Sequence, residues 1–312
     1  MEKLHNILLK FKPYVWLIEL SKKTDIPGFD KIPLYTVGSF FFAELGKESI
    51  LTKASSLAFN FFLAIFPAII FFFTLIPFVP IDNFQAELLS ILEQILPKNA
   101  FETTQETLED IIQNKSGNLL SFGFIFTLFL ATNGINTMMG AFNKSSLVFE
   151  NRSFIKQRLI ALFLTVALSL LLLVGVSLIT LGEFLLTFLE KEGFITDSIT
   201  YYLLLFSQWS GIGIIFFISI SMLYYFGPAT VRRWKFFSAG STLATLLTIL
   251  ASVLFAFYIN NFGTYNKLYG SIGTIIVIML WIYFNSIILL IGFELNASID
   301  ISRHKLTDST KN

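Results

Sequence analysis

The chain contains no cysteine and only two histidines, His5 and His304, which both lie in polar terminal segments. The absence of cysteine excludes disulfides, a thiolate nucleophile and any cysteine-ligated metal. The sequence also lacks a His-x-x-x-His spacing, a P-loop, a paired-carboxylate motif and a histidine placed near a serine in a pocket-forming pattern. It therefore predicts no catalytic residue, no metal site and no cofactor.

Charge is also scarce, and its absence is concentrated in particular stretches. Charged residues make up 14% of the chain against 54% hydrophobic residues, and the mean hydropathy is +0.72. Six stretches of 21 to 25 residues are almost free of charge: 56–79, 119–139, 159–182, 203–226, 238–259 and 271–295. Each can cross a bilayer as a helix, because a hydrocarbon core of about 30 Å needs about 20 helical residues. The sequence predicts an all-α, polytopic membrane protein, a six-transmembrane-helix bundle over residues 56–295 whose first partner is the lipid bilayer.

Lysines and arginines are divided unequally between the connecting segments. Alternate segments, counted from the N-terminus, hold 18 of them, and the intervening segments hold four. Because basic loops stay on the cytoplasmic side, we expect both termini in the cytoplasm. Arg232 and Arg233 then belong to a cytoplasmic basic loop, residues 296–312 form a polar cytoplasmic tail, and the loop 80–118 faces the periplasm.

The loop 80–118 carries seven acidic residues and two lysines. Its apolar residues line one side of a predicted helix that ends near Pro97, and a second short helix around Thr104–Ile112 would complete a helical hairpin. Such a hairpin could cover the outer mouth of the bundle. A solvated lid without function is the alternative.

Residues 1–55 form a separate region that we expect to be cytoplasmic and interfacial. Its first part places apolar residues at helical spacing with lysines between them: Leu4, Leu8, Phe11, Val15 and Ile18. The pattern is typical of a basic amphipathic helix on anionic lipid headgroups, and a helix packed on the cytoplasmic face of the bundle fits it equally well. After a break at Asp25–Pro33, Leu34–Leu45 is apolar but short, which predicts an in-plane elbow rather than a seventh crossing.

A few polar side chains interrupt the apolar stretches, and such residues usually face the bundle interior or a water-filled cavity. Six of them, at or near the spans, are candidates for a transport path: Asn60, Asn133, Asn136, Asn285, Glu294 and Asn296. For the two asparagines of the second stretch, the alternatives are a lined cavity and interhelical hydrogen bonds.

Glu294 is the only ionisable residue inside the six stretches. An intramembrane carboxylate is by default a candidate proton or cation site. Its position near the cytoplasmic end also allows an ion pair that fixes the helix orientation, with Arg232 and Arg233 or with Arg152 and Arg158 as partners. This position favours the ion pair.

The turn before the last stretch is predicted to be a compact outer cap. Gly263 and Gly270 can adopt positive φ at little cost. Tyr265 and Tyr269 are one helical turn apart, so both rings can anchor at the interface with their hydroxyls in water. The turn is either a stability motif or a substrate vestibule.

The most distinctive residues lie in the C-terminal third: Leu223–Pro228 (LYYFGP), Asn261–Gly273 (NFGTYNKLYGSIG) and Leu280–Asn296 (LWIYFNSIILLIGFELN). Together with Ala58–Pro67 (AFNFFLAIFP), they resemble the YihY/BrkB family of bacterial inner-membrane proteins over roughly residues 50–300. The resemblance implies six transmembrane helices, both termini inside and a place in the bacterial inner (plasma) membrane. Phe59 and Asn60 stand where the family typically carries tyrosines, so the roles of those hydroxyls do not transfer.

The family long carried a ribonuclease label, and this sequence argues against it. RNA cleavage requires metal ligands or acid/base pairs on a basic surface, and we predict neither an enzyme nor a nucleic-acid partner. The resemblance connects family members with virulence and with envelope lipid movement. The leading hypothesis is a transporter or gate for a lipid-like or small anionic solute, and the alternative is a non-transporting structural or partner-binding membrane protein. The sequence indicates no oligomeric state.

Overall fold

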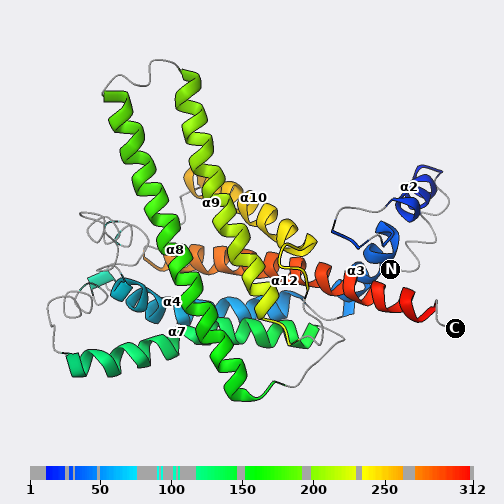
Figure 1. Cartoon of the computed structure of the whole chain (residues 1–312), viewed down its shortest axis with the longest axis horizontal. Coiled ribbons are helices and arrows are strands. Elements are labelled where there is room, and N and C mark those ends of the chain that lie inside the picture. The colour runs from blue at the N-terminus through cyan, green and yellow to red at the C-terminus, as the bar shows by residue number, and fades with distance from the viewer. Residues whose placement is uncertain are drawn as a thin grey trace.

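The computed structural model describes residues 12–24, 28–30, 32–47, 50–75, 90, 93, 101–102, 105, 117–145, 152–191, 198–229, 234–262 and 271–309. The helices of this part of the chain are α2 (Lys12–Lys23), α3 (Leu34–Lys47), α4 (Ile50–Leu75), α7 (Gly117–Ser145), α8 (Phe154–Lys191), α9 (Ser198–Phe226), α10 (Ala239–Phe262) and α12 (Ser271–Ser309) (Figure 1). The predicted all-α class is confirmed for the residues that the structure describes. Most of the loop 80–118, the basic pair Arg232 and Arg233, and the turn with Tyr265, Tyr269 and Gly270 lie outside the described residues.

Five helices of the described part are long and apolar enough to cross a bilayer: Ile50–Ala68, Phe154–Leu186, Ile199–Phe226, Ala239–Ile259 and Ile275–Arg303. They overlap five of the six predicted stretches. The remaining stretch, 119–139, lies in α7, which is not among the five. The sixth crossing therefore stays a prediction.

The last helix, α12, is the centre of the arrangement. It contacts α3, α4, α7 and α10, and Figure 1 shows it running across the molecule with α4 and α7 below it. The helices α8 and α9 form a hairpin that stands steeply across this layer. The hairpin is joined to the layer through contacts of α8 with α7 and of α9 with α10.

Aromatic rings fill the core between α7, α9 and α12. Phe142 stacks on Phe293 with ring centres 4.3 Å apart, and Tyr224 meets Phe142 edge-on at 5.7 Å. The Tyr224 hydroxyl donates a hydrogen bond of 2.7 Å to the carbonyl of Leu289. Each aromatic pair adds about 0.5–1.5 kcal/mol beyond the area that it buries. The first tyrosine of the LYYFGP motif therefore ties α9 to α12.

Two glycines let α10 and α12 pack backbone against backbone. A Cβ atom at Gly240 would overlap the carbonyl oxygen of Gly292, and one at Gly292 would lie 2.7 Å from both the Gly240 carbonyl oxygen and the Cβ of Ala244. Small residues permit this close approach between membrane helices. Gly240 and Ala244, two small residues of the fifth predicted stretch, therefore serve packing.

Residues 28–30 and 32–37 lie against the C-terminal part of α12. Phe29, Ile32, Val37 and Ile299 form a buried cluster. The chain reaches it through a turn with φ of 96° at Gly28 and 52° at Asp30, left-handed values that these two residue types tolerate best. This part of the N-terminal region is thus packed on the bundle, while the interfacial position of α2 stays a prediction.

Candidate functional site

An apolar chamber of about 370 Å³ lies between α4, α7, α8 and α12. Small residues open it, among them Ala64 on α4 and Ala131 and Gly134 on α7, and Leu168 of α8 and Trp281 of α12 form other parts of its wall. The missing side chain of Gly134 is required here, because a Cβ atom would lie 2.8 Å from the ring of Phe61. Four helices separated in sequence therefore build one cavity.

The polar side chains of the chamber already have hydrogen-bond acceptors in their own helices. Thr165 donates to the Ala161 carbonyl at 2.8 Å, Ser169 to the Thr165 carbonyl at 2.9 Å, and Ser286 to the Ile282 carbonyl at 2.8 Å. Asn285 donates through Nδ2 to the Trp281 carbonyl at 2.8 Å. None of the residues that line the chamber is charged. The chamber thus presents an apolar surface to anything that enters it.

Both asparagines of the second predicted stretch hold α7 to α8. Arg158 donates to Oδ1 of Asn133 at 2.7 Å, and Gln157 donates to Oδ1 of Asn136 at 2.9 Å. Of the two alternatives that the sequence left open, the structure shows interhelical hydrogen bonds for these side chains. Asn60 differs, because its Nδ2 donates within its own helix, to the Ser56 carbonyl at 2.8 Å.

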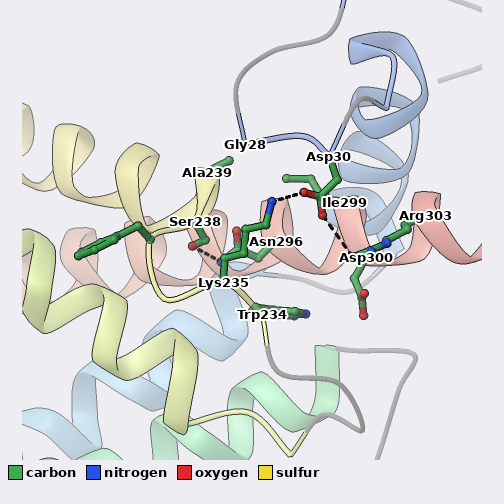
Figure 2. Close-up of a pocket in the computed structure, with 11 residues that line it drawn as sticks. Gly28, Asp30, Trp234, Lys235, Ser238, Ala239, Asn296, Ile299, Asp300 and Arg303 are labelled. Carbon is green, nitrogen blue, oxygen red and sulfur yellow. Dashed lines mark hydrogen bonds and ion pairs between the residues drawn. The ribbon is translucent and has the colours of Figure 1, made fainter.

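Asn296 forms part of the N-terminal cap of α10. Its Oδ1 accepts the backbone N–H of Gly240 at 2.8 Å, and its Nδ2 donates to Oγ of Ser238 at 2.9 Å. Ser238 also accepts the N–H of Ser241 and donates its own N–H to Oγ of Ser241, as in a reciprocal capping arrangement. Figure 2 shows Asn296 reaching from α12 toward Ser238. The groups of this cap satisfy helix donors that would otherwise be orphaned.

A small hollow of about 170 Å³ lies next to this cap and holds a charged cluster. Asp30 binds Lys235 through one carboxylate oxygen and Arg303 through the other, the latter at 3.4 Å (Figure 2). We call these three residues the clasp, since they join the turn before α3 to the start of α10 and the end of α12. Lys235 and Arg303 are largely exposed, and exposed pairs contribute at most about 1 kcal/mol. The clasp is a structural joint rather than an open anion site.

Glu294 is buried, with 4% of its surface exposed. This burial is compatible with both hypotheses for it, an intramembrane proton or cation site and an orienting ion pair. Arg158, one of its nominated partners, instead contacts Asn133 and the ring of Phe129. Arg232 and Arg233 lie outside the described residues, so Glu294 stays a candidate for either role.

Two sets of hydrogen bonds, one from Arg152 and one from Gln157 and Arg158, were not part of the sequence prediction. Arg152 donates to the carbonyls of Phe226, Gly227 and Pro228 and so caps the C-terminal end of α9. Arg158 and Gln157 pair with the asparagines of α7. A signal for Arg158 was available, because it precedes the third apolar stretch and shares a helix face with Thr165, seven residues later.

The chain matches a known protein family over most of its length. The model of the family described as Virulence factor BrkB matches residues 41–312. The chain belongs to this family. The resemblance to the YihY/BrkB proteins is thereby confirmed.

Three relatives show how the similarity is distributed over the chain. YfkH of Bacillus subtilis, whose name describes it as ribonuclease-like, is 35% identical over 262 residues, which are 82% of this chain and 92% of YfkH. The UPF0761 membrane protein IL2447 of Idiomarina loihiensis is 26% identical over 69% of this chain and 74% of its own length. A UPF0761 membrane protein of Psychromonas ingrahamii is 23% identical over 87% of this chain and 90% of its own length. No solved structure matches.

The BrkB family is described by its membrane character and not as an enzyme family. Among the described residues, no group of three or more histidine, aspartate and glutamate side chains could hold a metal ion. The chain is thus a membrane protein of the BrkB family with several apolar helices.

Proposed function

We propose that this protein binds a lipid-like solute in the apolar chamber and acts as a transporter or gate for it in the bacterial plasma membrane. The observation that carries the proposal is the chamber between α4, α7, α8 and α12, which has no charged residue among its described lining residues and whose serine and threonine hydroxyls donate inside their own helices. Ligand cavities of this size are mostly apolar and lie between the helices of bundles.

The residues that line the chamber favour one of the two solute classes of the leading hypothesis, which are a lipid-like solute and a small anionic solute. An acyl chain can fill an apolar chamber without losing hydrogen bonds. A small anion would lose its hydration and meet no cationic side chain among the described lining residues, whose serine and threonine hydroxyls already donate within their own helices, at a cost of several kcal/mol. The chamber therefore favours a lipid-like solute over a small anionic one.

Filling the chamber is expected to slow lipid movement. Leu172 lines the chamber and is 55% exposed, whereas Leu170 is 50% exposed and does not line it. Leu172→Trp should reduce the rate at which vesicles with the reconstituted protein move a fluorescent phospholipid between leaflets. We expect about a tenfold loss, because overpacking costs about 1–3 kcal/mol. The rate is measured by bleaching the outer-leaflet label.

Leu170→Trp is the matched control, since it changes the same residue type at similar exposure outside the chamber. It should move lipid at the wild-type rate. Equal rates for wild type and Leu172→Trp would contradict the chamber as the path, and wild-type vesicles no faster than protein-free vesicles would contradict transport itself.

The alternative, a non-transporting structural or partner-binding protein, is favoured by the asparagine contacts. Asn133 and Asn136 hold α7 to α8, and Asn296 caps α10, so three of the six polar candidates serve the assembly of the helices. The ribonuclease-like name of YfkH is not extended to this chain, and we propose no ribonuclease activity and no cofactor.

We further propose the orientation with both termini in the cytoplasm. The chain has no cysteine, so single cysteines can be placed without background. Lys115→Cys should react with a membrane-impermeant thiol reagent in intact cells from which any outer barrier has been removed, and Lys235→Cys should react only after lysis. The reverse pattern would overturn the orientation.

A further inference from the structure

Arg158 lies near the start of α8, within the candidate membrane span Phe154–Leu186 and directly before the apolar stretch 159–182. Its Nη2 donates to Oδ1 of Asn133 at 2.7 Å and to the carbonyl of Phe129 at 3.2 Å, and its guanidinium lies 3.9 Å from the centre of the Phe129 ring. These partners carry no charge. No carboxylate of the described residues contacts Arg158, and its buried Nε has no acceptor there.

An arginine in this position needs an anionic partner more than one in water does. Charged side chains in membrane segments usually pair with an opposite charge or with backbone carbonyls. Elsewhere in this chain, Lys235 and Arg303 share the carboxylate of Asp30. A guanidinium has five donors. The bonds of Arg158 use Nη2 and its Nε is buried, so the two donors of Nη1 remain for a ligand.

The geometry along α8 connects Arg158 to the chamber. Thr165 and Leu172, which line the chamber, lie seven and 14 residues after Arg158, so all three share one face within about 40°. They lie about 10 Å and about 21 Å from it along the helix axis. On α7, Asn133 directly precedes Gly134 of the chamber wall. The guanidinium therefore stands at one end of a strip that leads into the apolar cavity.

We propose that Arg158 binds the phosphate of an anionic phospholipid while an acyl chain of the same lipid occupies the chamber. The inference rests on the proposed function, because it supplies the headgroup contact for the lipid in the chamber. A guanidinium suits this role, since its planar fork matches the oxygens of a phosphate group and it is more weakly hydrated than an ammonium. The stack on Phe129 holds the fork in place without neutralising its charge.

The test compares the binding of two lipids with the same acyl chains, one with an anionic phosphoglycerol headgroup and one without it. The purified full-length protein in detergent is titrated with phosphatidylglycerol that carries brominated acyl chains, and separately with diacylglycerol that carries the same chains. Bromine quenches nearby tryptophans, and Trp281 lines the chamber. The part of the quenching that Trp281→Phe removes therefore reports a chain in the chamber.

Wild type is expected to bind the phosphatidylglycerol about tenfold or more tightly than the diacylglycerol, as for a hydrogen-bonded charge contact. Arg158→Gln should reduce this preference to less than about threefold, because the amide can still donate to Asn133 but carries no charge. Arg158→Lys should keep part of the preference. Lys156→Gln is the matched control, since it removes one exposed positive charge two residues away, and it should keep the full preference.

The outcomes separate the inference from the proposed function. Equal binding of both lipids by wild type, or an unchanged preference in Arg158→Gln, overturns the headgroup contact while the chamber still holds a chain. If neither lipid quenches Trp281, the proposed function fails as well. Wild type is also titrated with inorganic phosphate in competition: displacement of the phospholipid by millimolar phosphate would mean that the site serves a free anion, which contradicts the lipid source. If Arg158→Gln does not fold, the wild-type comparison and Arg158→Lys still decide the question.

Discussion

Gly240→Ala is expected to destabilise the protein by about 3 kcal/mol, more than a single methyl group usually does. The added Cβ atom would overlap the Gly292 carbonyl oxygen and lie 2.6 Å from the side-chain amide of Asn296. The Gly292 carbonyl oxygen belongs to the backbone of a neighbouring helix, so it cannot rotate away from the added methyl group as a flexible side chain can. The better helix propensity of alanine returns only about 1 kcal/mol. We expect a lower melting temperature in detergent and a loss of monodisperse protein in gel filtration.

Gly140→Ala is the control for this prediction. Gly140 also lies inside a helix, α7, but a Cβ atom there would meet nothing within 4 Å. The helix propensity should then dominate, and the variant should be as stable as wild type or more stable by up to about 1 kcal/mol. If both variants melt like wild type, α10 and α12 do not pack as closely as the structure shows.

Hydropathy predicted the helices of the membrane domain because a long apolar stretch has few other stable forms in a bilayer. It could not place helix ends that lie beyond the apolar stretch. The stretch 271–295 belongs to a helix that continues to Ser309, and Ala297, Ser298 and Ile299 at the start of the predicted polar tail are buried. Small or apolar residues such as these bury easily against neighbouring helices, and a hydropathy window that ends at residue 295 does not detect that.

The roles of the polar candidates depended on partners from other helices. The sequence identified Asn133 and Asn136 as residues that face the interior, because an amide that faced lipid would lack hydrogen-bond partners. It could not decide between a cavity and a hydrogen bond, because their partners Arg158 and Gln157 belong to another helix whose rotation the pattern does not fix. Asn285 and Asn296 lie on the same helix, yet one lines the chamber and the other caps α10.

The chamber itself could not be predicted from any single stretch. Its walls come from four helices, and its volume depends on small residues such as Ala64 and Gly134 meeting across α4 and α7. Within the sequence of one helix, a small residue such as Ala64 or Gly134 indicates only close packing against a neighbour and not a cavity. Only the crossing of α8 over α4, α7 and α12 leaves the space between them unfilled.

Asn296→Ala is expected to have the second large effect, a loss of about 3 kcal/mol. The change removes the acceptor of the Gly240 N–H and the donor to Ser238, both at the buried start of α10, and a buried group left without its partner costs about 1–3 kcal/mol. The apparent melting temperature in detergent should fall by about 5 °C or more. Asn285→Ala is the matched control on the same helix, because within the described part of the chain Asn285 bonds only the Trp281 carbonyl of its own helix, and it should shift the melting temperature far less.

Two further substitutions at the same position separate capping from the loss of side-chain volume. Asn296→Asp keeps an oxygen that can accept the Gly240 N–H, and a carboxylate near a helix N-terminus is favourable. It should restore part of the melting temperature. Asn296→Leu keeps the volume but no hydrogen bond, so it should be as unstable as Asn296→Ala or less stable, since Ser238 and Gly240 would face an apolar side chain. If Asn296→Leu instead matched wild type while Asn296→Asp did not, the residue would act by filling space, and the cap of α10 would rest on Ser238 and Ser241 alone.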